Sequence, residues 1–378
     1  MGPLEGIKVV EFAGLGAAPM CGMILADMGA EVFLIDRKSE KSAEASMHIK
    51  DRDMLNRGKY QLAADLKQSK DLTFVLDLIA KCNVVLESFR PGVMERLGLG
   101  PDICLEKNPS LVFARMSGWG QDGPLAMAAG HDPNYVALTG ALYHTGGADG
   151  VPQSPATLLG DAAGGAGMTA MGICAALIPA IQKGTGQVID AAIGEGTSYL
   201  TTLARSLYYV GQMTNDRGNS WMEGAAAWGR AYRCSDDKFI TLLPVEGRFY
   251  KTFLELMNLN QDPLFSVSHQ YDASQWQAQI AKLDSVFATR SRQQWCDLLE
   301  GTDACFAPVL SYDEAPQHPH NQARNNFVQA GEDWYPVPAP KFGVTQPEPD
   351  WDCDATANAR EALDRLGFDD CAVNTVVD

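Results

Sequence analysis

The feature that most constrains the fold of this chain is a regular alternation of short apolar runs with helix-like stretches over its first half. The apolar runs have the length and composition of buried strands and occupy residues 7–12, 31–36, 83–88 and 111–117. Helix-like stretches lie between them, at residues 20–28, 71–81 and 92–97. This alternation predicts an α/β fold with a mainly parallel sheet and helices on both faces. Ligands of such sheets bind at the carboxyl ends of the strands.

A second, smaller domain is expected farther along the chain. Two strand-like runs, 231–234 and 238–243, flank Ser235-Asp236-Asp237, a hairpin signal, and helix-like stretches follow. We therefore expect four parts. These are a large α/β domain over residues 1–212, a linker over 213–229, a small α+β domain over 230–315, and a C-terminal segment, 316–378, that returns to the large domain.

Charge and composition exclude several classes of protein. The net charge of −17 opposes binding to nucleic acid or to anionic membranes, and no run approaches the roughly 20 apolar residues of a membrane helix. The nine cysteines are scattered without a CxxC pair, which predicts reduced thiols in a cytoplasmic protein and neither a disulfide framework nor a metal site. Residues 37–70 hold nine basic and five acidic residues, a basic cluster suited either to a phosphorylated ligand or simply to a solvated surface.

Two short segments place a titratable side chain beside glycine at an expected helix start. They are Gly130-His131-Asp132-Pro133-Asn134-Tyr135 and Gly160-Asp161-Ala162-Ala163-Gly164-Gly165. Asp132 followed by Pro133 is a helix-start signal, and Asp161 is also suited to an N-cap. Imidazole and carboxylate exchange protons readily near neutral pH, so the two could serve opposite faces of one carbon if they converge. The glycines after Asp161 require a close approach by a neighbouring segment or by a ligand.

The loop after the first expected strand imitates part of a dinucleotide-binding fingerprint. Gly14 and Gly16 follow that strand, and Asp36 ends the next one, 20 residues beyond Gly16. Pro19 occupies the position of the third glycine, which weakens the match to a nicotinamide cofactor. Arg37 and Lys38 instead favour an adenine nucleotide that carries an additional phosphate.

A series of runs, in order along nearly the whole chain, resembles the family III CoA transferase superfamily and, within it, the α-methylacyl-CoA racemases. The runs are Val9-Val10-Glu11-Phe12-Ala13-Gly14, Ala26-Asp27-Met28-Gly29-Ala30-Glu31-Val32, Asn56-Arg57-Gly58-Lys59, Glu87-Ser88-Phe89-Arg90-Pro91-Gly92-Val93, Met94-Glu95-Arg96-Leu97-Gly98-Leu99-Gly100, Ala114-Arg115-Met116-Ser117-Gly118-Trp119-Gly120-Gln121, Gly130-His131-Asp132 and Gly160-Asp161.

The resemblance implies an isomerase of lipid metabolism that epimerises (R)- and (S)-2-methylacyl-CoA thioesters through an enolate, without a separate cofactor. It implies a Rossmann-like large domain and an interlocked homodimer. His131 and Asp161 would be the two acid/base groups, and Glu246 of the partner subunit would orient His131. The CoA moiety would be bound by Arg37, Arg57, Lys59, Arg90 and Gly16. Tyr135 and Met168 or Met171 would be pocket walls or core residues.

Two other functions remain open from the sequence. A family III CoA transferase would use Asp161 as a nucleophile and pass through an acyl anhydride, with no need for His131. A protein that binds CoA thioesters without catalysis is the third reading. The segment 223–230, EGAAAWGR, departs from the Gly/Pro/Tyr-rich loop of the racemases, and because we expect it beside the acyl pocket, the acyl part of the substrate stays open.

Overall fold

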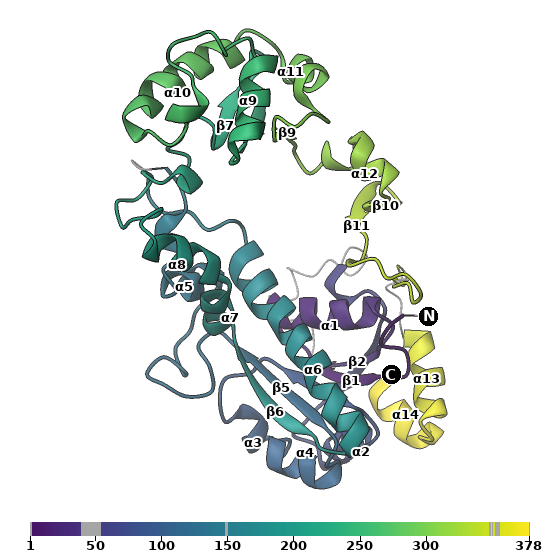
Figure 1. Ribbon diagram of the computed structural model, residues 1–378. Helices are drawn as coiled ribbons and strands as arrows, with labels where there is room; N and C mark the ends of the chain where they lie inside the picture. The colour runs from purple at the N-terminus through teal and green to yellow at the C-terminus, as the bar shows by residue number, and fades with distance from the viewer. Residues whose placement is uncertain are drawn as a thin grey trace. The chain divides into compact units, whose positions relative to one another are not determined.

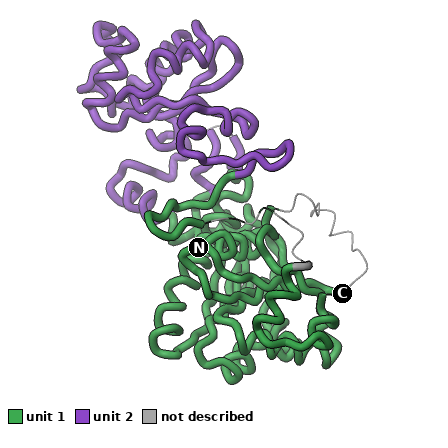
Figure 2. Tube along the Cα trace, turned by 90° about the vertical axis from the view of Figure 1, so that its right-hand side faces the viewer, with its two compact units in different colours: residues 1–141, 154–200, 336–378 green, residues 142–153, 201–335 purple. Residues whose placement is uncertain are grey.

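The computed structural model describes residues 2–38, 54–147, 150–347, 349, 351 and 356–377. The chain divides into two compact units (Figure 2). The large unit comprises residues 1–141, 154–200 and 336–378, and the small unit comprises 142–153 and 201–335. The small unit is therefore more extensive than the expected 230–315, and the chain returns to the large unit at residue 336 instead of 316.

A six-stranded sheet forms the centre of the large unit (Figure 1). Its strands are β1 (Lys8–Phe12), β2 (Glu31–Arg37), β3 (Lys59–Ala64), β4 (Val84–Glu87), β5 (Val112–Ser117) and β6 (Gln187–Ala192). They lie in the order β3-β2-β1-β4-β5-β6, and every neighbouring pair is parallel. The predicted parallel, Rossmann-like sheet is thus confirmed. The order reverses between β1 and β4, which is where ligands of open α/β sheets bind.

Helices cover both faces of this sheet, as the alternation predicts. One apolar cluster packs α1 (Ala17–Asp27) and α6 (Met168–Lys183) against one face. A second cluster packs α2 (Ser69–Ala80), α4 (Pro101–Lys107), α13 (Thr356–Arg365) and α14 (Asp370–Val377) against the other. Successive residues of β1 serve opposite faces, because Val9 belongs to the first cluster and Val10 to the second. The C-terminal helices therefore complete the core of the large unit.

The remaining helices of the large unit are short and lie near the ends of strands. They are α3 (Val93–Arg96), α5 (Asp132–Ala137), α7 (Ile193–Leu200), the π-helix η5 (Leu158–Gly167) and the 3₁₀ turn η3 (Met54–Asn56). Together η5 and α6 form one apolar run, Leu158–Lys183, the only described helix long and apolar enough to cross a membrane. The expectation that no run approaches the length of a membrane helix is therefore wrong for this run, although half of its most apolar stretch is buried within the fold.

The glycines of η5 admit a neighbouring helix. A methyl group on Gly164 would clash with Thr197 of α7, and one on Gly196 would clash with the carbonyl of Gly164. The two backbones therefore pack directly on one another. Close packing between chain segments, one of the two explanations that the sequence left open, accounts for these two glycines.

The small unit has the expected α+β composition. Strands β7 (Arg230–Arg233), β8 (Phe239–Leu242) and β9 (Phe306–Val309) form an antiparallel sheet, and β7 and β8 are the predicted hairpin. Its core contains side chains of α9 (Gly247–Leu256), α10 (Ala273–Phe287) and α11 (Arg292–Leu299). The unit also contains α8 (Thr202–Tyr209), α12 (Pro319–Ala323), β10 (Phe327–Ala330) and β11 (Asp333–Pro336).

Candidate active site

A pocket of about 280 Å³ lies at the carboxyl edge of the sheet, beside the point where the strand order reverses. Its walls come from the end of β5, from the segments that follow β1, β4 and β5, and from the starts of α1, α5, η5 and α7. The lining residues are Ala13, Gly14, Leu15, Gly16, Ala17, Ala18, Ser88, Phe89, Met116, Ser117, Gly118, Gly130, His131, Tyr135, Asp161 and Ile193. The structure thus brings His131, Asp161 and Gly16 together in one pocket.

Asp161 lies inside the first turn of η5, near the helix start expected for it, but it is not the N-cap. The N-cap is Thr157, with a left-handed backbone (φ 64°), and the Ala162 N–H donates to the Thr157 carbonyl at 3.0 Å, the wide spacing of a π-helix. The Asp161 N–H donates to Oδ2 of Asp132 at 2.8 Å. This amide is therefore engaged within the protein.

The pKa of the Asp161 carboxyl is raised above its ordinary value. Burial is the main cause, the negative charge of Asp132 adds to it, and His131 acts in the opposite direction. A carboxyl with a raised pKa retains its proton to a higher pH, so it can both accept and donate a proton in conditions where an ordinary aspartate stays ionised. Such a shift is common at catalytic sites.

His131 is the N-cap of α5, a position predicted for Asp132. Its backbone is extended (φ −134°, ψ 175°), and its N–H donates to Oδ1 of Asn134 at 3.0 Å. The imidazole is exposed at the pocket, while Asp132, the first residue of the helix, is buried. The local sequence thus forms a helix start as predicted, but shifted by one residue.

Tyr135 is a wall of the pocket. Its ring packs edge-on against Trp119, with centroids 4.8 Å apart, and its hydroxyl donates to the Gly130 carbonyl. Burial raises the pKa of Tyr135, and the charge of Asp161 raises it further, whereas Arg90 lowers it. Met168 and Met171, expected as walls or core, do not line this pocket, and Met171 is exposed.

Gly16 lies directly against the Asp161 carboxylate. Its φ of 69° favours glycine, and a methyl group at this position would lie 3.0 Å from Oδ2 of Asp161. The loop between β1 and α1 therefore approaches the carboxylate as closely as it does because residue 16 has no side chain.

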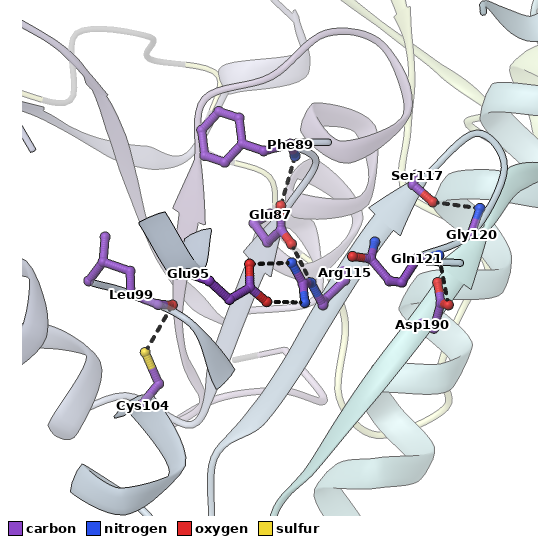
Figure 3. Close-up of polar contacts among 10 residues, drawn as sticks. All are labelled: Glu87, Phe89, Glu95, Leu99, Cys104, Arg115, Ser117, Gly120, Gln121 and Asp190. Carbon is purple, nitrogen blue, oxygen red and sulfur yellow. Dashed lines mark hydrogen bonds and ion pairs between the residues drawn. The ribbon is translucent and has the colours of Figure 1, made fainter. Parts of the chain in front are cut away.

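An ionic network, buried at Arg115 and Glu87 and exposed at Glu95, braces two of the pocket segments (Figure 3). Nε of Arg115 donates to Oε1 of Glu87 at 2.8 Å, and its terminal nitrogens donate to Glu95 at 2.6 and 3.2 Å. Oε2 of Glu87 accepts the Phe89 N–H at 2.7 Å. Burial raises the pKa of Glu87, while the hydrogen bond from Arg115 lowers that of Glu95.

The turn beyond β5 is held in a similar way. Oγ of Ser117 accepts the Gly120 N–H at 2.8 Å, and Oδ2 of Asp190 accepts the Gln121 N–H at 2.9 Å (Figure 3). Glu87, Glu95 and Arg115 belong to the runs that resemble the family, but no function was expected for them from the sequence. Charged residues inside apolar runs were the available signal, because a buried charge requires a partner.

The four expected phosphate ligands divide into two pairs. Arg37, at the end of β2, and Arg90, after β4, are exposed and available for a ligand. Arg57 is buried and donates twice to Asp27, at 2.9 and 2.5 Å, and Lys59 is buried with Nζ 2.8 Å from both oxygens of Glu11. The expectation that Arg57 and Lys59 contact phosphates is corrected by these internal ion pairs. Residues 39–53 of the basic cluster lie outside the described residues.

Glu246 belongs to the small unit, where it is the N-cap of α9 and its side chain is exposed. The 223–230 segment belongs to the same unit. Ala226, Ala227 and Trp228 are buried in the core of that unit, and Nε1 of Trp228 donates to the Gln270 carbonyl at 2.7 Å. These three side chains are therefore committed to the core of the small unit, and the expectation that the segment 223–230 borders an acyl pocket stays a prediction.

None of the residues that line the pocket is a cysteine. The eight cysteines among the described residues are all free. Within the same residues, no group of three or more His, Cys, Asp or Glu side chains could hold a metal ion.

The fold and the pocket define an α/β protein with a parallel, Rossmann-like sheet and a pocket at its carboxyl edge that is lined by a histidine and an aspartate. A model of CoA-transferase family III matches residues 4–353, and the chain belongs to this family. An alpha-methylacyl-CoA racemase of Mus musculus is 38% identical over 97% of this chain and 93% of its own length, and one of Homo sapiens is 38% identical over 97% and 94%. An acetyl-CoA:oxalate CoA-transferase of Acetobacter aceti is 28% identical over 87% of this chain and 86% of its own length.

Solved structures support the fold. A CaiB/BaiF family protein from Brucella suis superposes with a TM-score of 0.78 at 22% identity, covering 96% of this chain and 99% of that one. The Rv3272 protein of M. tuberculosis superposes with a TM-score of 0.74 at 24% identity.

Proposed function

We propose that this protein is an isomerase that interconverts (R)- and (S)-2-methylacyl-CoA thioesters by moving a proton at the α-carbon. The observation that carries this proposal is that His131 and Asp161, from separate segments, line one pocket at the carboxyl edge of the sheet. The similarity to alpha-methylacyl-CoA racemases over nearly the whole chain supports the same substrate class.

The chemistry requires two proton-transfer groups on opposite faces of the α-carbon. One group removes the α-proton, its electron pair moves into the thioester to give a planar enolate, and the other group donates a proton to the opposite face. His131 serves one epimer and Asp161 the other. The raised pKa of Asp161 suits it to both directions, since it must be ionised to accept a proton and protonated to donate one. No separate cofactor takes part, because CoA belongs to the substrate.

Arg37 and Arg90 are the proposed partners of the CoA phosphates, through charge-assisted hydrogen bonds. Both are exposed, and the charge of Arg90 acts on Tyr135 in the pocket wall. Gly16 lets the adjoining backbone approach the substrate beside Asp161.

A homodimer and a cytoplasmic location are also part of the proposal. Glu246 of the partner subunit would accept a hydrogen bond from His131 and orient its ring, a role open to a carboxylate that is exposed on its own unit. A monomer in sedimentation experiments at assay concentration would contradict this shared site.

Exchange of the α-hydrogen in heavy water tests the two-base scheme. The parent protein should incorporate deuterium from both epimers of a 2-methylacyl-CoA. His131→Ala should lose interconversion by about 10²–10⁴-fold, the usual contribution of a general acid/base, and keep exchange from one epimer. Asp161→Asn should keep exchange from the opposite epimer. His320→Ala, at an exposed histidine of the small unit, is the matched control and should behave as the parent.

The same assay separates the alternatives. A CoA transferase would move CoA to an acceptor acid, lose this activity in Asp161→Asn and keep it in His131→Ala. Binding without exchange or transfer would indicate a binding protein. Exchange of both epimers in both variants would contradict the assignment of His131 and Asp161.

A further inference from the structure

Asp132 connects the two segments that carry the proposed proton-transfer groups. It follows His131 directly, and only 3% of its surface is exposed. Its Oδ2 accepts the Asp161 N–H at 2.8 Å, and its Oδ1 accepts the Ser154 hydroxyl at 2.8 Å. One buried carboxylate thus holds the backbone of Asp161 and the turn that leads to η5, while its own backbone is continuous with His131.

Two features show that the surrounding chain is shaped around this carboxylate. A methyl group on Gly160 would clash with Oδ2 of Asp132, so residue 160 must lack a side chain for the contact to form. Ala156 and Thr157, between Ser154 and η5, have positive φ values of 30° and 64°. Such backbone is strained in residues other than glycine and persists where neighbouring contacts hold it. The bond from Ser154 to Asp132 is such a contact.

We propose that Asp132 is a positioning residue that fixes Asp161 relative to His131 across the pocket. The inference rests on the proposed two-base reaction. Both oxygens of Asp132 are used, so a shift of its side chain would move the first turn of η5 and with it the Asp161 carboxylate. Misplacement of a reacting group by about 1 Å can cost on the order of 10²-fold in rate.

Because Asp132 is charged, its positioning role can also be tested by the pH dependence of the activity. The charge of Asp132 is the second cause of the raised pKa of Asp161, after burial. His131 and Tyr135 are the other titratable groups that interact with Asp161. On the helices packed against η5, Asp27 of α1 is paired with Arg57, and Glu195 of α7 is exposed. As a base, Asp161 must be ionised, so its exchange activity is lost as the pH falls through its pKa. Removal of the Asp132 charge should lower that pKa and extend the activity to lower pH.

Asp132→Asn tests the inference, because an amide has a single acceptor oxygen and cannot replace both bonds. We expect kcat for racemisation to fall by about 10²-fold, with KM within a few-fold of the parent, because the nucleotide contacts are untouched. In the His131→Ala background only Asp161 should exchange protons. There, addition of Asp132→Asn should move the acid limb of the exchange profile to lower pH. Asp102→Asn removes an equal charge from an exposed position on α4 and should match the parent.

Ser154→Ala provides a second variant that keeps the charge. It should lower kcat less than Asp132→Asn and should not move the acid limb to lower pH. Circular dichroism checks the fold of each variant. If Asp132→Asn does not fold, Ser154→Ala alone tests the inference, and a kcat equal to that of the parent protein would overturn it. A folded Asp132→Asn with parent kcat, or with an unmoved acid limb, would overturn it as well. Failure of His131→Ala to show epimer-specific exchange would instead contradict the two-base scheme itself.

Discussion

Substitution of Lys59 tests whether this buried lysine stabilises the fold or binds CoA. Its ammonium is completely buried, and it contacts both oxygens of Glu11 at 2.8 Å, the Pro19 carbonyl at 2.9 Å and Oδ1 of Asn56 at 3.3 Å. Lys59→Met keeps much of the side-chain volume but leaves the Glu11 carboxylate buried without its cationic partner. We expect the variant to lose stability and to retain the parent affinity for free CoA once folded.

The magnitude follows from the burial of both partners. Removal of one member of a buried ion pair costs about 3–5 kcal/mol, because the other charge is left uncompensated. That is a large part of the roughly 5–15 kcal/mol that stabilises a typical protein. At about 2–4 °C per kcal/mol for a unit of this size, the unfolding midpoint should fall by roughly 6–20 °C. The double variant Glu11→Leu/Lys59→Met removes both charges and should recover most of the loss.

Urea unfolding followed by circular dichroism measures the stability, and titration calorimetry with free CoA measures the binding. Lys67→Met, at an exposed lysine nearby, is the control and should be close to the parent in both. Parent-like stability of Lys59→Met combined with weakened CoA binding would refute the reasoning. It would mean that Nζ of Lys59 contacts phosphate and that the buried pair with Glu11 is not a stabilising contact.

Two further variants address the substrate site. Arg90→Ala should weaken binding of free CoA by about 1–3 kcal/mol, the scale of a charged hydrogen bond, and the difference should shrink at high salt; calorimetry that gives equal affinities for variant and parent would remove Arg90 from the nucleotide site. Gly16→Ala should lower kcat strongly, because a left-handed backbone is strained with a side chain present and the new methyl would lie 3.0 Å from Oδ2 of Asp161; a parent-like rate of α-hydrogen exchange would show that the carboxylate tolerates this displacement.

The architecture of the large unit could be predicted from local patterns. Strands buried on both faces appear in the sequence as continuous apolar runs, and β1, β2, β4 and β5 were located in this way. A fifth strand was expected at residues 187–193 and is β6 (Gln187–Ala192). β3 (Lys59–Ala64) was missed because its sequence, KYQLAA, begins with a lysine and contains a glutamine. The charge of that lysine is neutralised by Glu11 of another strand, which no local pattern reveals.

The candidate site was predicted in part. His131 and Asp161 were identified because each stands beside glycine in a run typical of the family, and the structure places both in one pocket. The helix around Asp161 was expected to be a regular α-helix, but its first turns are a π-helix. The glycines of η5 pack against α7, a tertiary contact that no local sequence pattern reveals.

The alternation of strands and helices, the family and the choice of His131 and Asp161 as candidate proton-transfer groups could be inferred from the chain alone, because they depend on residue types and on their order. Which charged residues are available to a ligand follows only from the folded arrangement. Arg57 and Lys59 have the same chemistry as Arg37 and Arg90, but they meet Asp27 and Glu11, which are 30 and 48 residues away. Asp132 likewise acquires its two donors from residues 22 and 29 positions farther on. Whether a charged side chain stabilises the fold or binds a ligand depends on the partners that it meets in the folded chain. A buried charge must be paired because an unpaired one is costly, and the pair then serves the structure.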